Sequence, residues 1–200
     1  MSCLGRGRGE SPKPVALFGM RVTFRRTGER RYAVVVEVPG EAVQTMSPAP
    51  GFDEHIPHDL VHYVVEAALG LEAGVFGRAA RGGGTFYAAA TAANSREQAR
   101  KRRKQARREQ ALRRELANEE QLETSERLAY LSDIAWRRRH GQRPDPAFSP
   151  RSAPSSALEA ARIERVVSVL DMLAPQWNQL TAGGELTFTW PSLVPSARSV

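Results

Sequence analysis

Apolar and polar residues alternate from Met20 onward, and this pattern predicts a β-hairpin with one buried face. Val22 and Phe24 alternate with charged or hydroxyl-bearing residues, and the same period of two returns in residues 32–38. A turn around Gly28 separates the two strands, and Pro39 with the glycine that follows it ends the second one. A short third strand is expected within residues 42–46.

Further along the chain the apolar residues recur at helical spacing. Residues 57–69 form one such segment, which Gly70 is placed to end. The glycine-rich stretch 74–84 predicts a short helix flanked by turns, and another helix is expected to start at Thr124 or Ser125. Ser156, which begins a capping box, precedes a strongly amphipathic helix that Pro175 is expected to end.

The last apolar alternation places Leu186, Phe188 and Trp190 on one face of a C-terminal strand. A terminal strand needs a sheet to join, and the N-terminal hairpin is the available one. The sequence therefore predicts an α+β fold, in which a small antiparallel sheet is covered on one face by helices.

The same patterns set the expected domain boundaries. Residues 1–19 contain too few apolar side chains to offset the entropy of ordering, so we expect a disordered tail. A single domain is expected over residues 20–191, with an exposed basic helix at 95–123 and a Pro/Ser-rich linker at 140–156. Residues 192–200 are expected to be a C-terminal tail.

Composition excludes several classes of protein. The 200 residues, 41% of them hydrophobic, suffice for one domain with a core. The single cysteine, Cys3, excludes an intrachain disulfide and a cysteine-based zinc site, which favours a reducing cytoplasmic location. No stretch approaches the roughly 18 consecutive apolar residues of a membrane helix, so no membrane partner is expected.

The net charge of +7 is concentrated in one predicted helix. Residues 96–114 contain ten Lys or Arg and two Glu, a local charge of 10 − 2 = +8. Such a helix could neutralise phosphates of RNA or DNA, or bind another acidic partner. Alternatively, the acidic block that follows pairs with this positive charge, either within the chain or in an antiparallel homodimer. The candidate nucleic-acid contacts are Arg96, Arg100, Lys101, Arg103, Lys104, Arg107 and Arg108.

Three of the four histidines, His55, His58 and His62, lie within eight residues. On a helix His58 and His62 point the same way, with Glu66 one turn further on. Two imidazoles at this spacing can hold one zinc ion, with His55, Asp53 or Asp59 completing the site and Glu66 as a further candidate ligand. Asp59 or Glu66 could serve as proton acceptor for a bound water. The alternative is that the histidines are structural and stabilise the first helical turn and the edge of the core.

The run from His58 to His62 resembles the His-Asp-x-x-His zinc motif of the Coq4 family of ubiquinone-biosynthesis proteins, which implies zinc as the ligand. In that family a glutamate follows the second histidine after eleven residues, but the matching position here is Gly74, and Glu66 and Glu72 are out of register. The family is also largely helical. The chain further resembles bacterial proteins in which a strand hairpin precedes Pro-His-Asp-Leu-x-His, a likeness that implies no activity.

These observations leave three hypotheses open. The first is a small cytoplasmic metal-binding protein, and the second is a non-enzymatic nucleic-acid-binding or scaffold protein that acts through residues 96–114. The third is a protein-interaction module with neither chemistry. Whether the chain is an enzyme stays open, because the sequence contains no His-Glu-x-x-His, P-loop or Gly-x-Ser-x-Gly motif.

Overall fold

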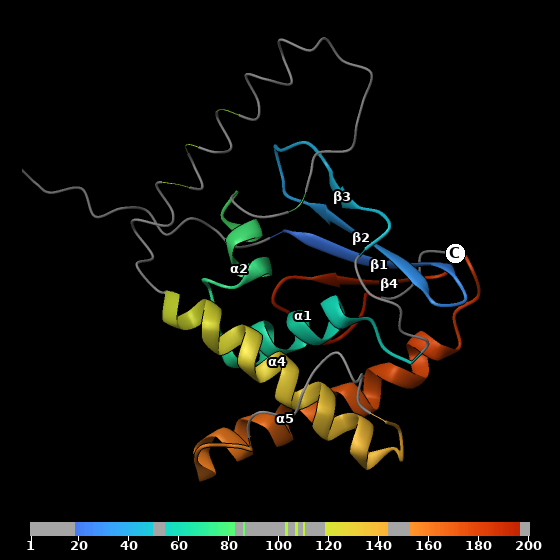
Figure 1. Cartoon of the computed structure of the whole chain (residues 1–200). Coiled ribbons are helices and arrows are strands. Elements are labelled where there is room, and N and C mark those ends of the chain that lie inside the picture. Colours follow the sequence, from blue (N-terminus) through green and yellow to red (C-terminus); the bar gives the residue numbers. More distant parts are fainter. Residues whose placement is uncertain are drawn as a thin grey trace, which may run out of the picture.

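Four antiparallel strands form one sheet in the order β3-β2-β1-β4 in the computed structural model (Figure 1). The strands are β1 (Arg21–Gly28), β2 (Arg31–Glu37), β3 (Gln44–Met46) and β4 (Glu185–Thr189). The helices are α1 (His58–Leu69), α2 (Val75–Ala80), α4 (Glu119–Arg139) and α5 (Ala157–Asn178). The structure describes residues 19–49, 55–82, 119–143 and 153–196, together with the single residues 86, 103, 107 and 110.

Strand β1 is central because it pairs with both its hairpin partner and the C-terminal strand. Phe24 lies opposite Val34 of β2 and opposite Leu186 of β4. The period of two places these three apolar side chains on the same face of the sheet. The structure thus confirms the predicted α+β fold, including the predicted pairing of the last strand with the hairpin.

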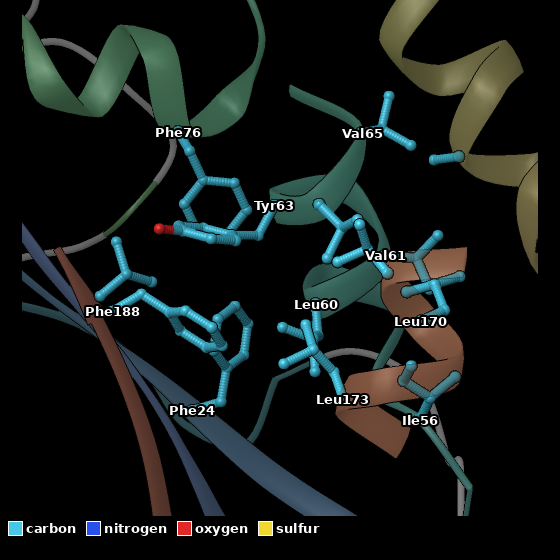
Figure 2. Close-up of a cluster of buried hydrophobic side chains, with 14 of the residues drawn as sticks. Phe24, Ile56, Leu60, Val61, Tyr63, Val65, Phe76, Leu170, Leu173 and Phe188 are labelled. Carbon is cyan, nitrogen blue, oxygen red and sulfur yellow. The ribbon is translucent and has the colours of Figure 1, made fainter. Parts of the chain in front are cut away.

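The helices cover that apolar face, and α1 is packed between the sheet and α4 (Figure 1). Aromatic side chains from four elements meet under the sheet, where Phe24, Tyr63, Phe76 and Phe188 are all fully buried (Figure 2). Because α1 has neighbours on several sides, even its polar residues His62 and Glu66 are buried. This location places part of the predicted site in the interior, whereas His55, His58 and Asp59 are half-buried.

Two helix boundaries differ from the predictions. Helix α4 runs without a break through Thr124, whose hydroxyl donates a hydrogen bond to the Glu120 carbonyl at 2.6 Å and so needs no N-cap position. Helix α5 continues past Pro175 to Asn178, because burial of Trp177 in the core stabilises its last turn. A proline removes one hydrogen bond from a helix, and here packing outweighs that loss.

Other helix ends match their sequence signals. The Ser156 hydroxyl accepts a hydrogen bond from the backbone N–H of Glu159 at 3.1 Å, as the capping box predicts. Gly70 ends α1 in the left-handed conformation with φ 66°. These local signals therefore predict the end of α1 and the start of α5 correctly.

The chain stays attached to the domain after β4. The hydroxyl of Tyr63 donates to the Ser192 carbonyl at 2.8 Å, and the N–H of Ser196 donates to the Thr187 carbonyl at 2.7 Å. The first residues of the predicted C-terminal tail are therefore packed against the domain. Of the predicted N-terminal tail, residues 1–19, all but Gly19 lie outside the described residues, and so does most of the predicted helix 95–123.

Candidate functional site

The two histidines predicted to share one helical face meet in the first turns of α1. The Nε2 atoms of His58 and His62 lie 3.1 Å apart, and the two rings are nearly perpendicular, at 89°. Pro57 immediately precedes the helix as its N-cap and offers no side-chain hydrogen bond. The four-residue spacing on an α-helix is sufficient to explain why the two imidazoles face each other.

A carboxylate from another helix faces the same pair. Glu126 of α4 places an Oε2 atom 3.6 Å from Nε2 of His62. Its side chain is 59% exposed, whereas that of His62 is only 6% exposed, so the cluster opens to solvent on the α4 side. Sequence reasoning missed Glu126, because its only signal was membership of the acidic block that follows the arginine-rich segment.

Asp59, next to His58 in the first turn of α1, is oriented by a different part of the fold. Tyr32 of β2 donates its hydroxyl proton to Asp59 Oδ2 at 2.8 Å. Burial raises the pKa of Asp59, although the Tyr32 bond and the nearby His58 lower it. His55 is half-buried in the turn that precedes α1.

Glu66 does not take the place predicted for it beside the histidines. Its side chain is fully buried, and Oε1 accepts hydrogen bonds from the Val75 N–H at 2.8 Å and the Ser125 hydroxyl at 3.1 Å. Oε2 accepts from the N–H groups of Phe76 at 2.8 Å and Gly77 at 3.2 Å. Four donors thus engage both carboxylate oxygens of Glu66, which is directed at the start of α2 and at Ser125.

The carboxylate of Glu66 instead anchors the N-terminus of α2. Free N–H groups and the helix dipole make a helix N-terminus attractive to a negative charge. Gly74 leaves the necessary space, because a Cβ atom there would overlap the carboxylate. Burial raises the pKa of Glu66 to about 7, while the hydrogen bonds from the α2 amides and Ser125 lower it.

His62 is held as a neutral imidazole. Burial is the larger cause that lowers the pKa of His62 to about 3, and the neighbouring His58 is the smaller one. Within the described part of the chain its Nδ1 atom is buried without a hydrogen-bond partner. A neutral imidazole is the form that binds metal ions. Because burial disfavours the protonated form of His62, the stability of the folded protein depends on pH.

Acidification should therefore weaken the fold through His62. The unfolded chain takes up a proton near pH 6.5, whereas the folded His62 resists protonation until about pH 3, so stability is lost as the pH falls through this window. In chelator-containing buffer, we expect protonation of His62 in the unfolded chain to lower the free energy of unfolding by about 2 kcal/mol between pH 7 and pH 5. Urea unfolding of the wild type and of His62→Gln at both pH values measures this difference. Equal losses in the two proteins would contradict the assignment.

The pair of imidazoles is the preorganised part of the cluster. Among the residues described in the structure, no three or more His, Cys, Asp and Glu side chains form a ready-made metal-binding group. The predicted set of His55, His58, Asp59, His62 and Glu66 is therefore not assembled around one point. A third ligand therefore has to come from a side chain that can move toward the two Nε2 atoms.

The second predicted site, the basic helix, falls almost wholly outside the described residues. Arg103 and Arg107 are helical and exposed, as predicted for that segment. Binding of RNA or DNA, and a homodimer formed through this helix, remain predictions. The remaining candidate contacts that the structure does not describe are Arg96, Arg100, Lys101, Lys104 and Arg108.

Comparisons with protein-family models, with curated proteins and with solved structures found no match to this chain. The resemblance of the segment from His58 to His62 to a zinc motif therefore stays a prediction. Within the described residues, the helices are too short or too polar to span a bilayer. The function proposed below accordingly rests on the geometry of the site.

Proposed function

We propose that this protein binds a divalent transition-metal ion, with zinc as the preferred ion, at the start of α1. The Nε2 atoms of His58 and His62 are the proposed nitrogen ligands, and Glu126 of α4 is the proposed carboxylate ligand. The observation that carries the proposal is the 3.1 Å separation of the two Nε2 atoms, in a pair of rings of which His62 is buried and His58 half-buried.

The donor separations support this proposal. Zinc bonds of about 2.0–2.1 Å in a tetrahedral site place neighbouring ligand atoms about 3.3 Å apart. The distance between the two histidine nitrogens, 3.1 Å, and that from His62 to Glu126, 3.6 Å, lie on either side of this value. The exposed Glu126 side chain can adjust by a rotation, because the fold does not enclose it.

A structural explanation of the same distance competes with the proposal. Two neutral imidazoles 3.1 Å apart can share one Nε2–H···N hydrogen bond, and this would make His58 and His62 a structural pair. A metal ion would accept both lone pairs at once. The two explanations differ in whether zinc stabilises the protein, so a binding experiment separates them.

The proposed ligand set also bears on the kind of site. With two histidines and one carboxylate from the protein, a bound zinc ion keeps one coordination position open for water, as in catalytic rather than structural zinc sites. Asp59, which Tyr32 orients at 2.8 Å, is the nearest further carboxylate along α1. Metal binding is the proposed function.

Calorimetric titration of chelator-treated protein with zinc tests the proposal. We expect one zinc ion per chain and a zinc-dependent rise in melting temperature, because binding to the folded state alone stabilises it. The double substitution His58→Ala, His62→Ala should lower the affinity at least about 100-fold, since it removes both nitrogen ligands. Circular dichroism establishes whether the variant is folded.

His140→Ala is the matched control for a lost imidazole. His140 directly follows the C-terminal end of α4, where its Nε2 atom contacts Asp171 at 2.8 Å, and it has no part in the proposed site. Zinc affinity should be unchanged in this variant. A wild type without stoichiometric zinc binding, or a double variant that binds as tightly as the wild type, would sink the proposal and favour the structural pair.

A further inference from the structure

Three polar side chains of α4 point toward α1 and the segment after it. The Gln121 side-chain carbonyl accepts a hydrogen bond from the Ala73 N–H at 3.1 Å. Ser125 donates to Glu66 at 3.1 Å, and Glu126 faces His62 at 3.6 Å. The N-terminal half of α4 thus meets α1 along a row of polar links, in addition to its apolar contacts.

From Arg127 onward, α4 also forms ion pairs with a different helix, α5. Arg127 forms a two-point ion pair with Glu159 of α5, with distances of 2.8 and 3.1 Å. Arg139 contacts both Glu164 and Asp171 of α5. Attachment to α5 therefore does not depend on the histidines, whereas part of the attachment to α1 does.

Of these three polar links, the contact between Glu126 and His62 is the loosest. Its 3.6 Å separation from His62 exceeds a normal N–H···O hydrogen bond, while the other two links lie within that range. An ion bound to His58, His62 and Glu126 would replace this loose contact with three metal–ligand bonds. Such a bridge joins segments far apart in the chain, and closing a long loop stabilises the folded state.

We propose that the metal ion acts as a clasp that fastens the N-terminal half of α4 to α1, so that metal occupancy controls how firmly α4 is docked. This inference rests on the proposed function, since it requires the ion to be bound at the start of α1. It goes further by making Glu126 a bridging ligand and metal binding a regulator of the helix that follows the basic segment.

Hydrogen–deuterium exchange of the full-length chain, with zinc or with a chelator, tests the clasp. In zinc we expect backbone amides of residues 121–130 to exchange at least about tenfold more slowly, because local opening must first release the metal. Peptides from the C-terminal half of α5 should change little. Glu126→Gln, at an exposed position, should keep the fold but lose most of this zinc-dependent protection.

Glu123→Gln is the matched control, because Glu123 is exposed on α4 one turn before Glu126. It should keep the full protection in zinc. If calorimetry shows stoichiometric zinc binding while exchange in α4 is unchanged, or if Glu126→Gln retains the protection, the clasp is overturned and the metal site stands. Absence of zinc binding to the wild type overturns both.

Discussion

Replacing Glu66 by leucine should lower the free energy of unfolding by at least about 3 kcal/mol, since each buried N–H left without an acceptor costs about 1–3 kcal/mol. Three backbone amides at the start of α2, together with Ser125, donate to the Glu66 carboxylate. Leucine keeps the size and the helical preference of the side chain but accepts none of these bonds. Urea unfolding followed by circular dichroism measures the loss.

Two further substitutions separate the parts of this network. Ser125→Ala removes one donor and leaves the α2 amides satisfied, so we expect a loss of only about 1 kcal/mol. Gly74→Ala should be costly, because the added Cβ would overlap the Glu66 carboxylate and force it away from the amides. A Glu66→Leu protein as stable as the wild type would show that the carboxylate does not hold α2.

Truncation of Phe24 is expected to produce the other large loss of stability, about 3–5 kcal/mol for Phe24→Ala. Phe24 is fully buried in the centre of the sheet, with ring centroids 5.9 Å from Tyr63, 6.1 Å from Phe76 and 6.0 Å from Phe188 (Figure 2). Alanine leaves a cavity among elements from both ends of the chain, which cannot close without moving a strand or a helix.

The matched comparisons are Phe24→Leu and Met172→Ala. Leucine preserves most of the apolar volume, so its cost should be clearly smaller than that of alanine. Met172 is 61% exposed on α5, and its truncation should change stability by no more than about 0.5 kcal/mol. If Phe24→Ala costs no more than Met172→Ala, the aromatic cluster is not the centre of the core.

Local patterns were enough to predict most of the secondary structure. The alternation around Phe24 identifies the hairpin, since a strand directs every second side chain to one face. Gly70 and Ser156 mark helix ends, because the left-handed conformation and N-capping depend on neighbouring residues only. Where these signals failed, at Thr124 and Pro175, burial and packing outweighed a local preference.

The partner of the histidines could not be predicted in the same way. His58 and His62 face each other because they lie one turn apart on one helix, and their spacing in the sequence shows this directly. Glu126 reaches His62 only because α4 packs across α1. Nothing near Glu126 in the sequence distinguishes it from the other glutamates of its acidic block.

The sequence by itself determined the α+β class, the hairpin and the pairing of the two imidazoles, since each depends on residues close together in the chain. Only the tertiary structure decided the role of Glu66, which lies one helical turn beyond His62 and therefore looked like part of the same site. The amides of α2 and the space left by Gly74 bind its carboxylate instead. Buried N–H groups at the start of α2 need a hydrogen-bond acceptor, and the Glu66 carboxylate supplies it. The spacing of residues along α1 contains no information about this contact with α2.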